Sequence, residues 1–495
     1  MKYAVIRRNR DFVGRKRELS RLAEIHSRAE ASIIVVHGRR RVGKTELIEQ
    51  FFRKDRVLKF EGLQSPPPKQ NQKRVFRQRQ IDHCVGLLAD YAQDVMLSRL
   101  KIERWYDFFK LLTPYISERP VILYFEETQW LAAYQSDLFA EMKPHWDDSW
   151  RHNAGLRVVF AGSSPSFLKK QFMSDQALYN RSQYTIALEP FSPKEVGAYL
   201  KDKGGHDRLL AGLCIGGVPE YLRLLRQEPS VTMGLAKHSF RRDAPLLNEY
   251  TKIFVSSMAH SQHYQQVIEA LAHHRFLSRS DLARRVIGKD APGGSFSAVL
   301  DDLVQCGFIK QYSSVHLSNG RNLTRYRIAD EYLWFYHLFI APERRNIDRG
   351  RYEDNPLAAI DTQAFRVNLG FAFERWCMKN LVFLAEVLGF DQVEYDAGPY
   401  FRREKDSGHK GYQIDLVFIR KDKTLVFTEC KYLNGPAGLD VVRRMDANVE
   451  LFLSQNTKYR SYTIQKVLIA PQGAKNTIVP GLHVSRIVTL PDLLL

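Results

Sequence analysis

The chain has 495 residues, of which 44% are hydrophobic and 26% charged, and its formal net charge at pH 7 is +19. This length exceeds what one hydrophobic core serves and predicts several domains, while the ordinary composition excludes a wholly disordered chain. No apolar run approaches the ~20 residues of a membrane-spanning helix.

The basic excess favours a polyanionic partner, and nucleic acid is the commonest one for an intracellular protein. The alternative is a basic solvated surface without a partner. The five cysteines are scattered and form no C-x-x-C pair, which argues against a disulfide framework or a structural zinc site. With no apolar signal segment at the amino end, we expect a cytoplasmic protein.

A nucleotide-binding loop is predicted by "GRRRVGKT", residues 38–45, which follows the apolar strand "SIIVVH" and precedes an amphipathic helix. Gly38 and Gly43 allow the backbone amides to curl around phosphate groups. We expect Lys44 to contact the β- and γ-phosphates of ATP and Thr45 to ligate Mg²⁺. Strand, loop and helix in this order are typical of P-loop nucleotidases.

A partner strand, "VILYFEE" at 121–127, ends in two acids. We expect Glu126 to bind Mg²⁺ and Glu127 to position the attacking water. The first acid is usually Asp, so Glu126 predicts slow hydrolysis. A further strand, "VVFAGSS", ends with Ser163 and Ser164, either of which could sense the γ-phosphate. Alternation of strands and helices predicts a mainly parallel sheet covered on both faces.

Arg181, in "LYNRSQ", is either an arginine finger or an ordinary surface arginine. From "FSPKEVGAYL" to about residue 254 the pattern is helical. Residues 255–345 then predict three helices and two strands around "SNG", which describes a winged helix-turn-helix. Its third helix, 295–305, would face duplex DNA. Two acids on that helix, Asp301 and Asp302, weaken this case, and the alternative is a spacer or a contact with the ATPase.

The last part of the chain opens with a predicted long helix over 361–389 and continues with the strands "VEYD", "YQIDLVFIR", "TLVFTECKY" and "KVLIAP". The two middle strands predict a hairpin. If its loop is 421–423, Asp415 lies opposite Glu429, and the period of two places Lys431 on the same face as Glu429. A slip of one residue would send Asp415 to the other face.

Two carboxylates and an ammonium on one face indicate metal-dependent cleavage of a phosphodiester. Asp415 and Glu429 would hold Mg²⁺ or Mn²⁺, and the Cys430 carbonyl could add a ligand. Lys431 would orient water or stabilise the developing charge. Glu374, in "GFAFERWC" on the preceding helix, could complete the metal shell. The alternative is an exposed hairpin with ordinary surface charges.

Two resemblances follow from these motifs. The stretches "FVGRKREL", "EETQWL", "GSSPSFL", "LYNRS", "LEPFS" and "GGVPEYL", taken with the nucleotide loop, occur in the order seen in archaeal-type ATPases of the AAA/STAND-like group. This resemblance covers about residues 11–340. It implies that Gly14 and Arg15 lie near the adenine and that Pro219 in a helical lid helps to read the nucleotide state.

Several members of that family carry a carboxy-terminal domain like a restriction endonuclease. Over 361–475 the pattern of Asp415, Glu429 and Lys431 resembles the PD-(D/E)XK nuclease superfamily, with Ile414 where the superfamily name has Pro. This superfamily is metal-dependent, in keeping with the chemistry inferred above for these residues.

The sequence therefore predicts a multidomain α/β protein. Its parts are a P-loop ATPase core (1–190), a helical lid (191–254), a winged helix (255–345) and a restriction-endonuclease-like α/β domain (346–495). We expect a slowly hydrolysing ATPase whose nucleotide state controls a metal-dependent deoxyribonuclease. The alternative is a nucleotide-switched, DNA-associated regulator whose nuclease-like domain is inactive. The expected partners are ATP and nucleic acid, most often DNA, and no membrane. A homo-oligomer is compatible with the sequence.

Overall fold

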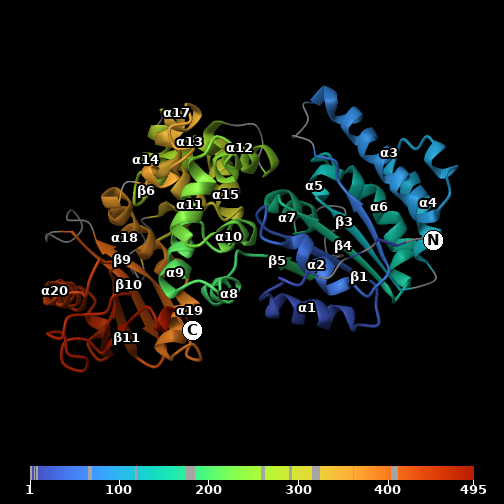
Figure 1. Ribbon diagram of the computed structural model, residues 1–495. Helices are drawn as coiled ribbons and strands as arrows, with labels where there is room; N and C mark the ends of the chain where they lie inside the picture. Colours follow the sequence, from blue (N-terminus) through green and yellow to red (C-terminus); the bar gives the residue numbers. More distant parts are fainter. Residues whose placement is uncertain are drawn as a thin grey trace.

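The computed structural model describes residues 3–4, 6, 9–64, 70–117, 120–173, 184–257, 262–288, 293–314, 324–360, 362–402 and 411–494. Figure 1 shows three parts in chain order: a sheet with its helices in blue to teal, a mainly helical part in green to yellow, and a second sheet with its helices in orange to red. No helix in these ranges is long and apolar enough to cross a membrane.

The first sheet is parallel, with the strand order β2-β3-β4-β1-β5. Its strands are β1 (Ser32–His37), β2 (Val57–Glu61), β3 (Val121–Glu126), β4 (Leu156–Gly162) and β5 (Tyr184–Ala187). Its α-helices are α1 (Lys16–His26), α2 (Lys44–Phe52), α3 (Lys73–Ala92), α4 (Trp105–Ile116), α5 (Thr128–Leu131), α6 (Asp137–Asp148) and α7 (Pro165–Met173). Short 3₁₀ turns join them at η1 (Gln70–Gln72), η2 (Leu97–Arg99) and η3 (Trp150–His152).

Alternate residues of each strand enter two different cores. Ile33 and Val35 of β1 pack in a cluster with α3, α4 and α6. Ile34 and Val36 pack in another cluster with α1 and α2. Because side chains alternate along a strand, a sheet with helices on both faces buries both sets. The expected parallel, doubly covered sheet is confirmed.

A helical segment and a small sheet follow. The helices are α8 (Pro193–Tyr199), α9 (Gly205–Cys214), α10 (Pro219–Arg226), α11 (Val231–Phe240) and α12 (Pro245–Ser257). Next come α13 (Gln262–Ala272), β6 (Leu277–Ser278), α14 (Arg279–Ile287), α15 (Gly294–Gln305), β7 (Ile309–Tyr312) and β8 (Arg325–Ile328). The strands pair antiparallel in the order β6-β8-β7. The expected turn at 318–320 lies outside the described residues.

The last part begins with α16 (Glu331–Phe335), the π-helical turn η4 (Tyr336–Ile340), α17 (Ala341–Asp348) and η5 (Pro356–Ala359). Its sheet has the order β13-β12-β11-β10-β9. Strand β10 pairs antiparallel with both β9 and β11, whereas β12 pairs parallel with both β11 and β13. The elements are α18 (Thr362–Lys379), α19 (Leu381–Leu388), β9 (Tyr395–Arg402), β10 (Tyr412–Arg420), β11 (Thr424–Cys430), α20 (Leu439–Gln455), η7 (Thr457–Tyr459), β12 (Thr463–Ile469), β13 (Arg486–Val488) and η8 (Asp492–Leu494).

The single long helix expected over 361–389 is wrong, because the chain breaks at Asn380 into α18 and α19. The Asn380 side chain donates to the Trp376 carbonyl at 2.8 Å, and its backbone leaves the helical conformation. Asparagine favours such a break because its amide competes with the backbone for hydrogen bonds. The strand expected at "VEYD" is longer than predicted and runs to Arg402.

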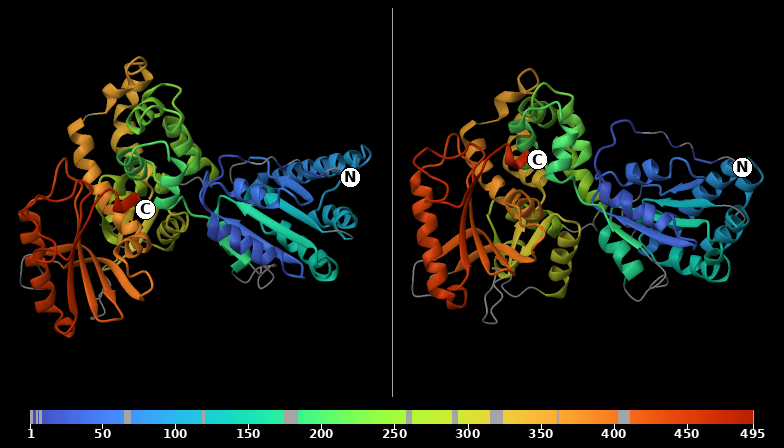
Figure 2. Two further views of the ribbon diagram at one scale, coloured as in Figure 1. Left: turned by 60° about the horizontal axis from the view of Figure 1, so that its bottom comes forward. Right: turned by 90° about the horizontal axis from the view of Figure 1, so that it is seen from below.

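One hydrophobic cluster runs from α8 through α13–α16 and α18 to one face of the C-terminal sheet. The first sheet keeps its own two clusters. In both views of Figure 2 the C-terminus lies against the middle part of the chain. There Leu493 and Leu494 line a small cavity of about 30 Å³ together with Val196 and Leu209. The helical segment and the C-terminal domain therefore pack as one body.

Candidate functional site

The nucleotide loop connects β1 to α2 with tight backbone geometry. A side chain at Gly38 would lie 2.2 Å from the Leu188 carbonyl, and Gly43 has φ +91°, so both positions favour glycine. Lys44 begins α2, and its ammonium donates to the carbonyls of Gly38 and Arg39 at 3.1 and 3.0 Å. Burial lowers the pKa of Lys44, as expected of a lysine that awaits anionic phosphates.

The two residues expected at Mg²⁺ are in contact. The Thr45 hydroxyl donates to one carboxylate oxygen of Glu126, at the end of β3. The other oxygen lies 2.5 Å from the Lys59 ammonium of β2, which also contacts Glu49 at 2.8 Å. Burial opposes the charge of Lys59, but the carboxylates of Glu126 and Glu49 outweigh it and raise its pKa. A hydroxyl and a carboxylate fit Mg²⁺, although Lys59 competes for Glu126.

Glu127 points toward the end of β4. Its carboxylate accepts hydrogen bonds from Ser163 at 2.9 Å and from Gln129 at 2.6 Å, and Gln129 also contacts Ser163 at 3.1 Å. Glu127 has φ +47°, an unusual conformation for a non-glycine residue that is found at functional sites. Of the two candidate serines, Ser163 therefore makes the contact with the acid expected to position water.

Two cavities adjoin the loop. One, of about 360 Å³, is lined by Lys44, Thr45, Glu126, Glu127 and Pro219, among others. The second, of about 130 Å³, shares Gly43 and Pro219 with the first. Apolar side chains such as Phe12 and Phe191 line it together with charged ones such as Arg15, Asp11 and Glu220. Together they offer a polar end for phosphates and a more apolar end for a base.

Of the two residues expected near the adenine, Arg15 lines the second cavity. Arg15 donates to the carbonyls of Glu189 and Val42 at 2.7 Å each, and its guanidinium lies 4.6 Å from the Phe191 ring centroid. Gly14 packs against Glu195 of α8. Arg181 lies outside the described residues.

Arginines within the loop reach the next part of the chain, which sequence reasoning missed. Arg39 forms a buried ion pair with Asp330 and donates to the Tyr221 hydroxyl at 3.2 Å. Arg41, with φ +69°, lies 2.8 Å from the Glu249 carboxylate of α12. The side chains of Arg39 and Asp330 are only 6% and 2% exposed, so this pair is a strong link between the loop and α16.

The carboxy-terminal hairpin has the expected register. Leu416 pairs with Thr428 and Ile419 with Leu425, and continuing this ladder sets Asp415 opposite Glu429. The pairing of β10 with β9 shifts between Ile414 and Val417. Such a bulge re-aims side chains and is common beside active sites.

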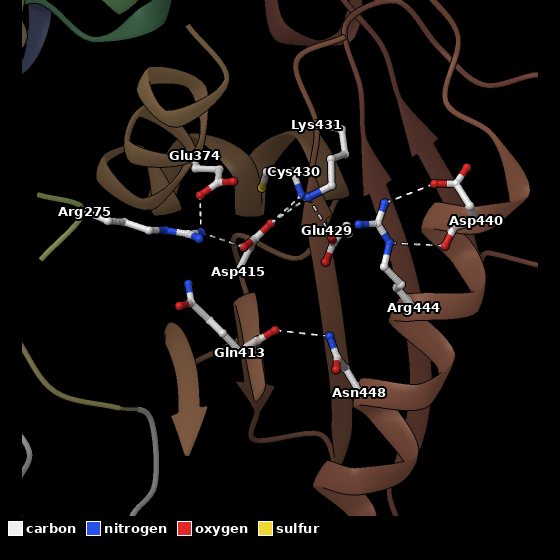
Figure 3. Close-up of polar contacts among 10 residues, drawn as sticks. All are labelled: Arg275, Glu374, Gln413, Asp415, Glu429, Cys430, Lys431, Asp440, Arg444 and Asn448. Carbon is white, nitrogen blue, oxygen red and sulfur yellow. Dashed lines mark hydrogen bonds and ion pairs between the residues drawn. The ribbon is translucent and has the colours of Figure 1, made fainter. Parts of the chain in front are cut away.

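Figure 3 shows three acidic side chains, Glu374, Asp415 and Glu429, which lie beside the cations Arg275 and Lys431. Lys431 lies 2.7 Å from Glu429 and 3.8 Å from Asp415, and the Cys430 amide donates to Asp415 at 3.1 Å. On the opposite side, Arg275 contacts Glu374 of α18 and lies 3.4 Å from Asp415. These residues form the acid cluster: Glu374, Asp415, Glu429, Lys431 and Arg275.

Arg275 comes from the loop between α13 and β6, about 100 residues before Glu374 in sequence. Sequence reasoning missed it, because no local pattern marks an arginine that acts across domains. Within the described residues, no three His, Cys, Asp or Glu side chains are gathered closely enough to hold a metal ion. Asp415 and Glu429 share Lys431, whereas Glu374 is bound to Arg275.

Burial gives the cluster unusual acidities. Burial, reinforced by the Asp415 carboxylate, raises the pKa of Glu374 to about 7. The same two causes raise the pKa of Glu429. Burial opposes the charge of Lys431, but Asp415 and Glu429 outweigh it and raise its pKa. Three buried acids thus crowd one another, which is typical of a functional site.

The comparisons with known proteins agree with the first site. Residues 12–223 match the family described as an ATPase domain predominantly from Archaea. This part of the chain is similar to an archaeal ATPase domain. Residues 334–447 match a family described as archaeal and bacterial proteins of unknown function. The ATPase match supports ATP as the nucleotide of the loop.

An uncharacterized protein of Methanocaldococcus jannaschii is 22% identical over 428 residues, covering 85% of this chain and 87% of that protein. Among solved structures, a Walker-type ATPase of Pyrococcus abyssi is 18% identical with a TM-score of 0.49, over 68% of this chain and 98% of its own. An ORC2 protein of Aeropyrum pernix with ADPNP and ADP is 14% identical with a TM-score of 0.43, over 72% and 96% of the chains.

Proposed function

We propose that the protein binds and slowly hydrolyses ATP, and that its nucleotide state controls a metal-dependent nuclease site at the acid cluster. The observation that carries the ATPase half is the convergence of Lys44, Thr45 and Glu126 on one cavity. In this reading Thr45 and Glu126 hold Mg²⁺, and Glu127, supported by Ser163, orients the water. The Lys59 ammonium on Glu126 supports slow turnover, because it competes with the metal.

The link between nucleotide and nuclease is inferred from the loop arginines. Arg39 is paired with Asp330, and the next residue, Glu331, is paired with Lys379 of α18 at 2.7 Å. The same helix carries Glu374. A change in the loop on binding or losing the γ-phosphate would therefore act on α16 through the buried Arg39–Asp330 pair, which costs several kcal/mol to break. The partly exposed pair of Glu331 with Lys379 would carry the change to α18 more weakly.

We infer that the module from α13 to β8 is a winged helix that contributes to DNA binding. Its three helices and antiparallel sheet support this reading. Helix α15 also packs against α7 of the ATPase, and Asp302 accepts a hydrogen bond from Tyr264 at 2.7 Å. The contact with α7 favours a linking role for α15, so phosphate contacts would come from basic side chains elsewhere on the module.

We infer that residues 362–494 form a restriction-endonuclease-like domain of the PD-(D/E)XK kind. The arrangement of Asp415 and Glu429 around Lys431 supports it. Asp415 and Glu429 would hold Mg²⁺ or Mn²⁺, with Glu374 as a further ligand. Lys431 would stabilise negative charge that develops on the phosphate.

A specific observation favours a second candidate, a nucleotide-switched DNA-associated regulator. The acids are bonded to Arg275 and Lys431, two cations that offset the charge a metal would otherwise balance. If these pairs are permanent, the site would be a structural ion cluster and the protein would bind DNA without cutting it.

The test compares purified wild-type protein with Lys44→Ala, Glu127→Gln, Asp415→Ala and Lys431→Ala. Lys44→Ala should lose most ATP affinity by calorimetry, and Glu127→Gln should bind ATP without turnover. Cleavage of DNA should require Mg²⁺ or Mn²⁺ and stop with a chelator. It should disappear in Asp415→Ala, whereas Lys431→Ala should keep metal binding and lose cleavage by about 10²-fold or more.

The Asp415→Ala, Glu429→Ala double variant sets the background from contaminating nuclease. ATP should change the cleavage rate of wild-type protein and leave that of Lys44→Ala unaltered. Wild-type protein that binds DNA but cuts neither DNA nor RNA above this background, with or without ATP, would replace the nuclease with the regulator.

A further inference from the structure

The nucleotide loop, residues 38–45, carries three successive arginines, and acids from later segments hold two of them. Arg39 forms the buried pair with Asp330, which precedes α16. Arg41 lies 2.8 Å from the Glu249 carboxylate of α12. The charges of these two arginines are therefore balanced within the protein, whatever the loop binds.

The middle arginine, Arg40, lacks such a partner. Within the part of the chain that the structure describes, its side chain makes no hydrogen bond or ion pair. The Glu249 carboxylate attracts it at longer range but is already paired with the next arginine of the loop. Arg40 is partly exposed and lines the cavity of about 360 Å³ together with Lys44, Thr45 and Glu126. A cavity of this size has room for a small-molecule ligand.

Arg40 and Lys44 bring two positive charges to this one cavity. Burial lowers the pKa of Lys44, and the charge of Arg40 lowers it further. The carboxylates of the cavity, Glu126 and Glu127, are bonded to other side chains. Like charges that face the same space repel each other, and an anion bound between them relieves the repulsion. The position of Arg40 therefore suits a phosphate group that Lys44 also contacts.

The polar cavity corresponds to the reacting end of the nucleotide. Arg40 shares it with Thr45 and Glu126, expected at Mg²⁺, and with Glu127, expected at the attacking water. Arg15 lines the other cavity, which is more apolar and suits the base. These placements set Arg40 at the γ-phosphate end of a bound ATP.

We propose that Arg40 binds the γ-phosphate of ATP within its own chain and stabilises the charge that develops there during hydrolysis. A planar guanidinium can donate two parallel hydrogen bonds to phosphate oxygens. In GTPases an arginine supplied by a partner protein or by the same chain makes this contact and raises kcat by about 10³–10⁵-fold. Arg40 would fill this role, for which Arg181 is the candidate from the sequence alone. The inference deepens the proposed ATPase and rests on it for the nucleotide.

The experiment compares the affinities of full-length protein for ADP and for ADPNP, an ATP analogue that is not hydrolysed, by calorimetry with Mg²⁺. Arg40→Met should weaken ADPNP binding at least about tenfold and ADP binding by less than about twofold, because only ADPNP has a γ-phosphoryl group. Arg40→Lys keeps the charge and should restore part of the preference for ADPNP. Arg53→Met is the control, at an exposed arginine that follows α2 at the end away from the loop. It should leave both affinities unaltered.

Turnover tests the catalytic part of the proposal. At saturating ATP, Arg40→Met should lower kcat by about 10²-fold or more, and Arg53→Met should not change it. Mixing Arg40→Met with Lys44→Ala shows whether the arginine acts in its own chain, because the Lys44→Ala protein keeps Arg40 but cannot hold ATP. Turnover of the mixture should equal the sum of the separate proteins. Turnover that recovers on mixing would overturn a contact within one chain in favour of one between two copies.

The outcomes separate this inference from the proposed ATPase. If Arg40→Met changes the ADP and ADPNP affinities equally, or not at all, while binding still depends on Lys44, the ATPase stands and the γ-phosphate contact is removed. If Arg40→Met loses ADPNP binding selectively and wild-type protein never turns over ATP, the contact stands and hydrolysis is removed.

Discussion

Cations hold the key carboxylates of both sites in place. Lys59 binds Glu126 in the ATPase, and Arg275 and Lys431 bind the acids of the C-terminal cluster. A buried carboxylate without such a partner would take up a proton or cost several kcal/mol. At the scale of single residues, these pairs make metal binding a competition between a cationic side chain and a metal ion.

His337 provides a residue-scale prediction about pH. It lies in the π-helical turn η4, its Nε2 atom is buried without a hydrogen-bond partner in the described part of the chain, and Tyr250 packs against its ring. Burial, with a smaller effect of His273, lowers the pKa of His337 to about 4 from 6.5. Because the unfolded chain binds the proton more tightly, stability is fully present above pH 6.5 and is lost as pH falls toward 4.

We expect the thermal unfolding midpoint of the wild-type protein to decrease as the pH is lowered from 6.5 to 4. His337→Phe should make this decrease smaller, because it should avoid a loss of up to about 3 kcal/mol in the free energy of unfolding at pH 4. Scanning calorimetry at several pH values measures it, with the exposed His152→Gln as the control. Identical pH profiles for wild type and His337→Phe would show that His337 does not carry the proton linkage.

At the scale of elements, the hairpin of β10 and β11 brings the C-terminal acids together. Its register places Asp415 and Glu429 on one face, and Asp415 lies within the bulge against β9, 3.8 Å from Lys431. Helix α18 adds Glu374 from outside the sheet, and the loop before β6 adds Arg275. The cluster therefore depends on the docking of four elements rather than on one motif.

Arg275 is the element-scale prediction. Arg275→Gln should remove the cation between Glu374 and Asp415. The attraction of the arginine to these carboxylates is worth about 1 kcal/mol or more, so its loss should let the acids bind Mn²⁺ about tenfold more tightly. Isothermal calorimetry with Mn²⁺ on full-length protein measures it. Arg284→Gln, at a 63% exposed arginine of α14, is the matched control. Weaker Mn²⁺ binding in Arg275→Gln would show that the arginine organises the site instead of competing for it.

At the scale of the whole molecule, the nucleotide loop and the C-terminal domain are joined by charge and by a shared core. One hydrophobic cluster unites the helical segment, the β6–β8 module and α18, whereas the ATPase sheet has separate clusters. The ATPase therefore meets a body with a continuous hydrophobic core. The buried Arg39–Asp330 pair connects the loop to that body.

Asp330→Asn tests this connection. The amide can still accept the N-terminal hydrogen bond of α16, which Asp330 now accepts from the Leu333 amide at 2.9 Å, but it leaves Arg39 buried without a negative partner. We expect a loss of about 3 kcal/mol or more in the free energy of unfolding, and the effect of ATP on DNA cleavage or binding should disappear.

Chemical denaturation and ATP-dependent binding assays measure the two effects. The double variant with Arg39→Met should recover much of the stability, since it removes the unpaired charge, but it should not restore the response to ATP. A response to ATP that survives in Asp330→Asn would assign the coupling to another contact, such as Arg41 with Glu249.

The sequence by itself determined those features that depend on local spacing. The nucleotide loop needs glycines, a lysine and a threonine at fixed intervals, and the alternating strands of β1 and β3 bury both faces, so the ATPase sheet and the placement of Lys44, Thr45 and Glu126 were predictable. The hairpin register followed from a loop of three residues and from period-two alternation. The break at Asn380 was missed because the apolar pattern of the helix continues across it.

Only the tertiary structure decided which cations meet which acids. Lys59 lies 67 residues from Glu126 in sequence, Arg39 lies 291 residues from Asp330, and Arg275 lies 99 residues from Glu374. Arginines and lysines are so frequent in this basic chain that no spacing singles these three out. Their pairing follows from the order of the sheet and from the shared core that sets the β6–β8 module beside α18. Burial there, which the sequence does not reveal, turns ordinary charges into the linked pairs on which control by nucleotide would depend.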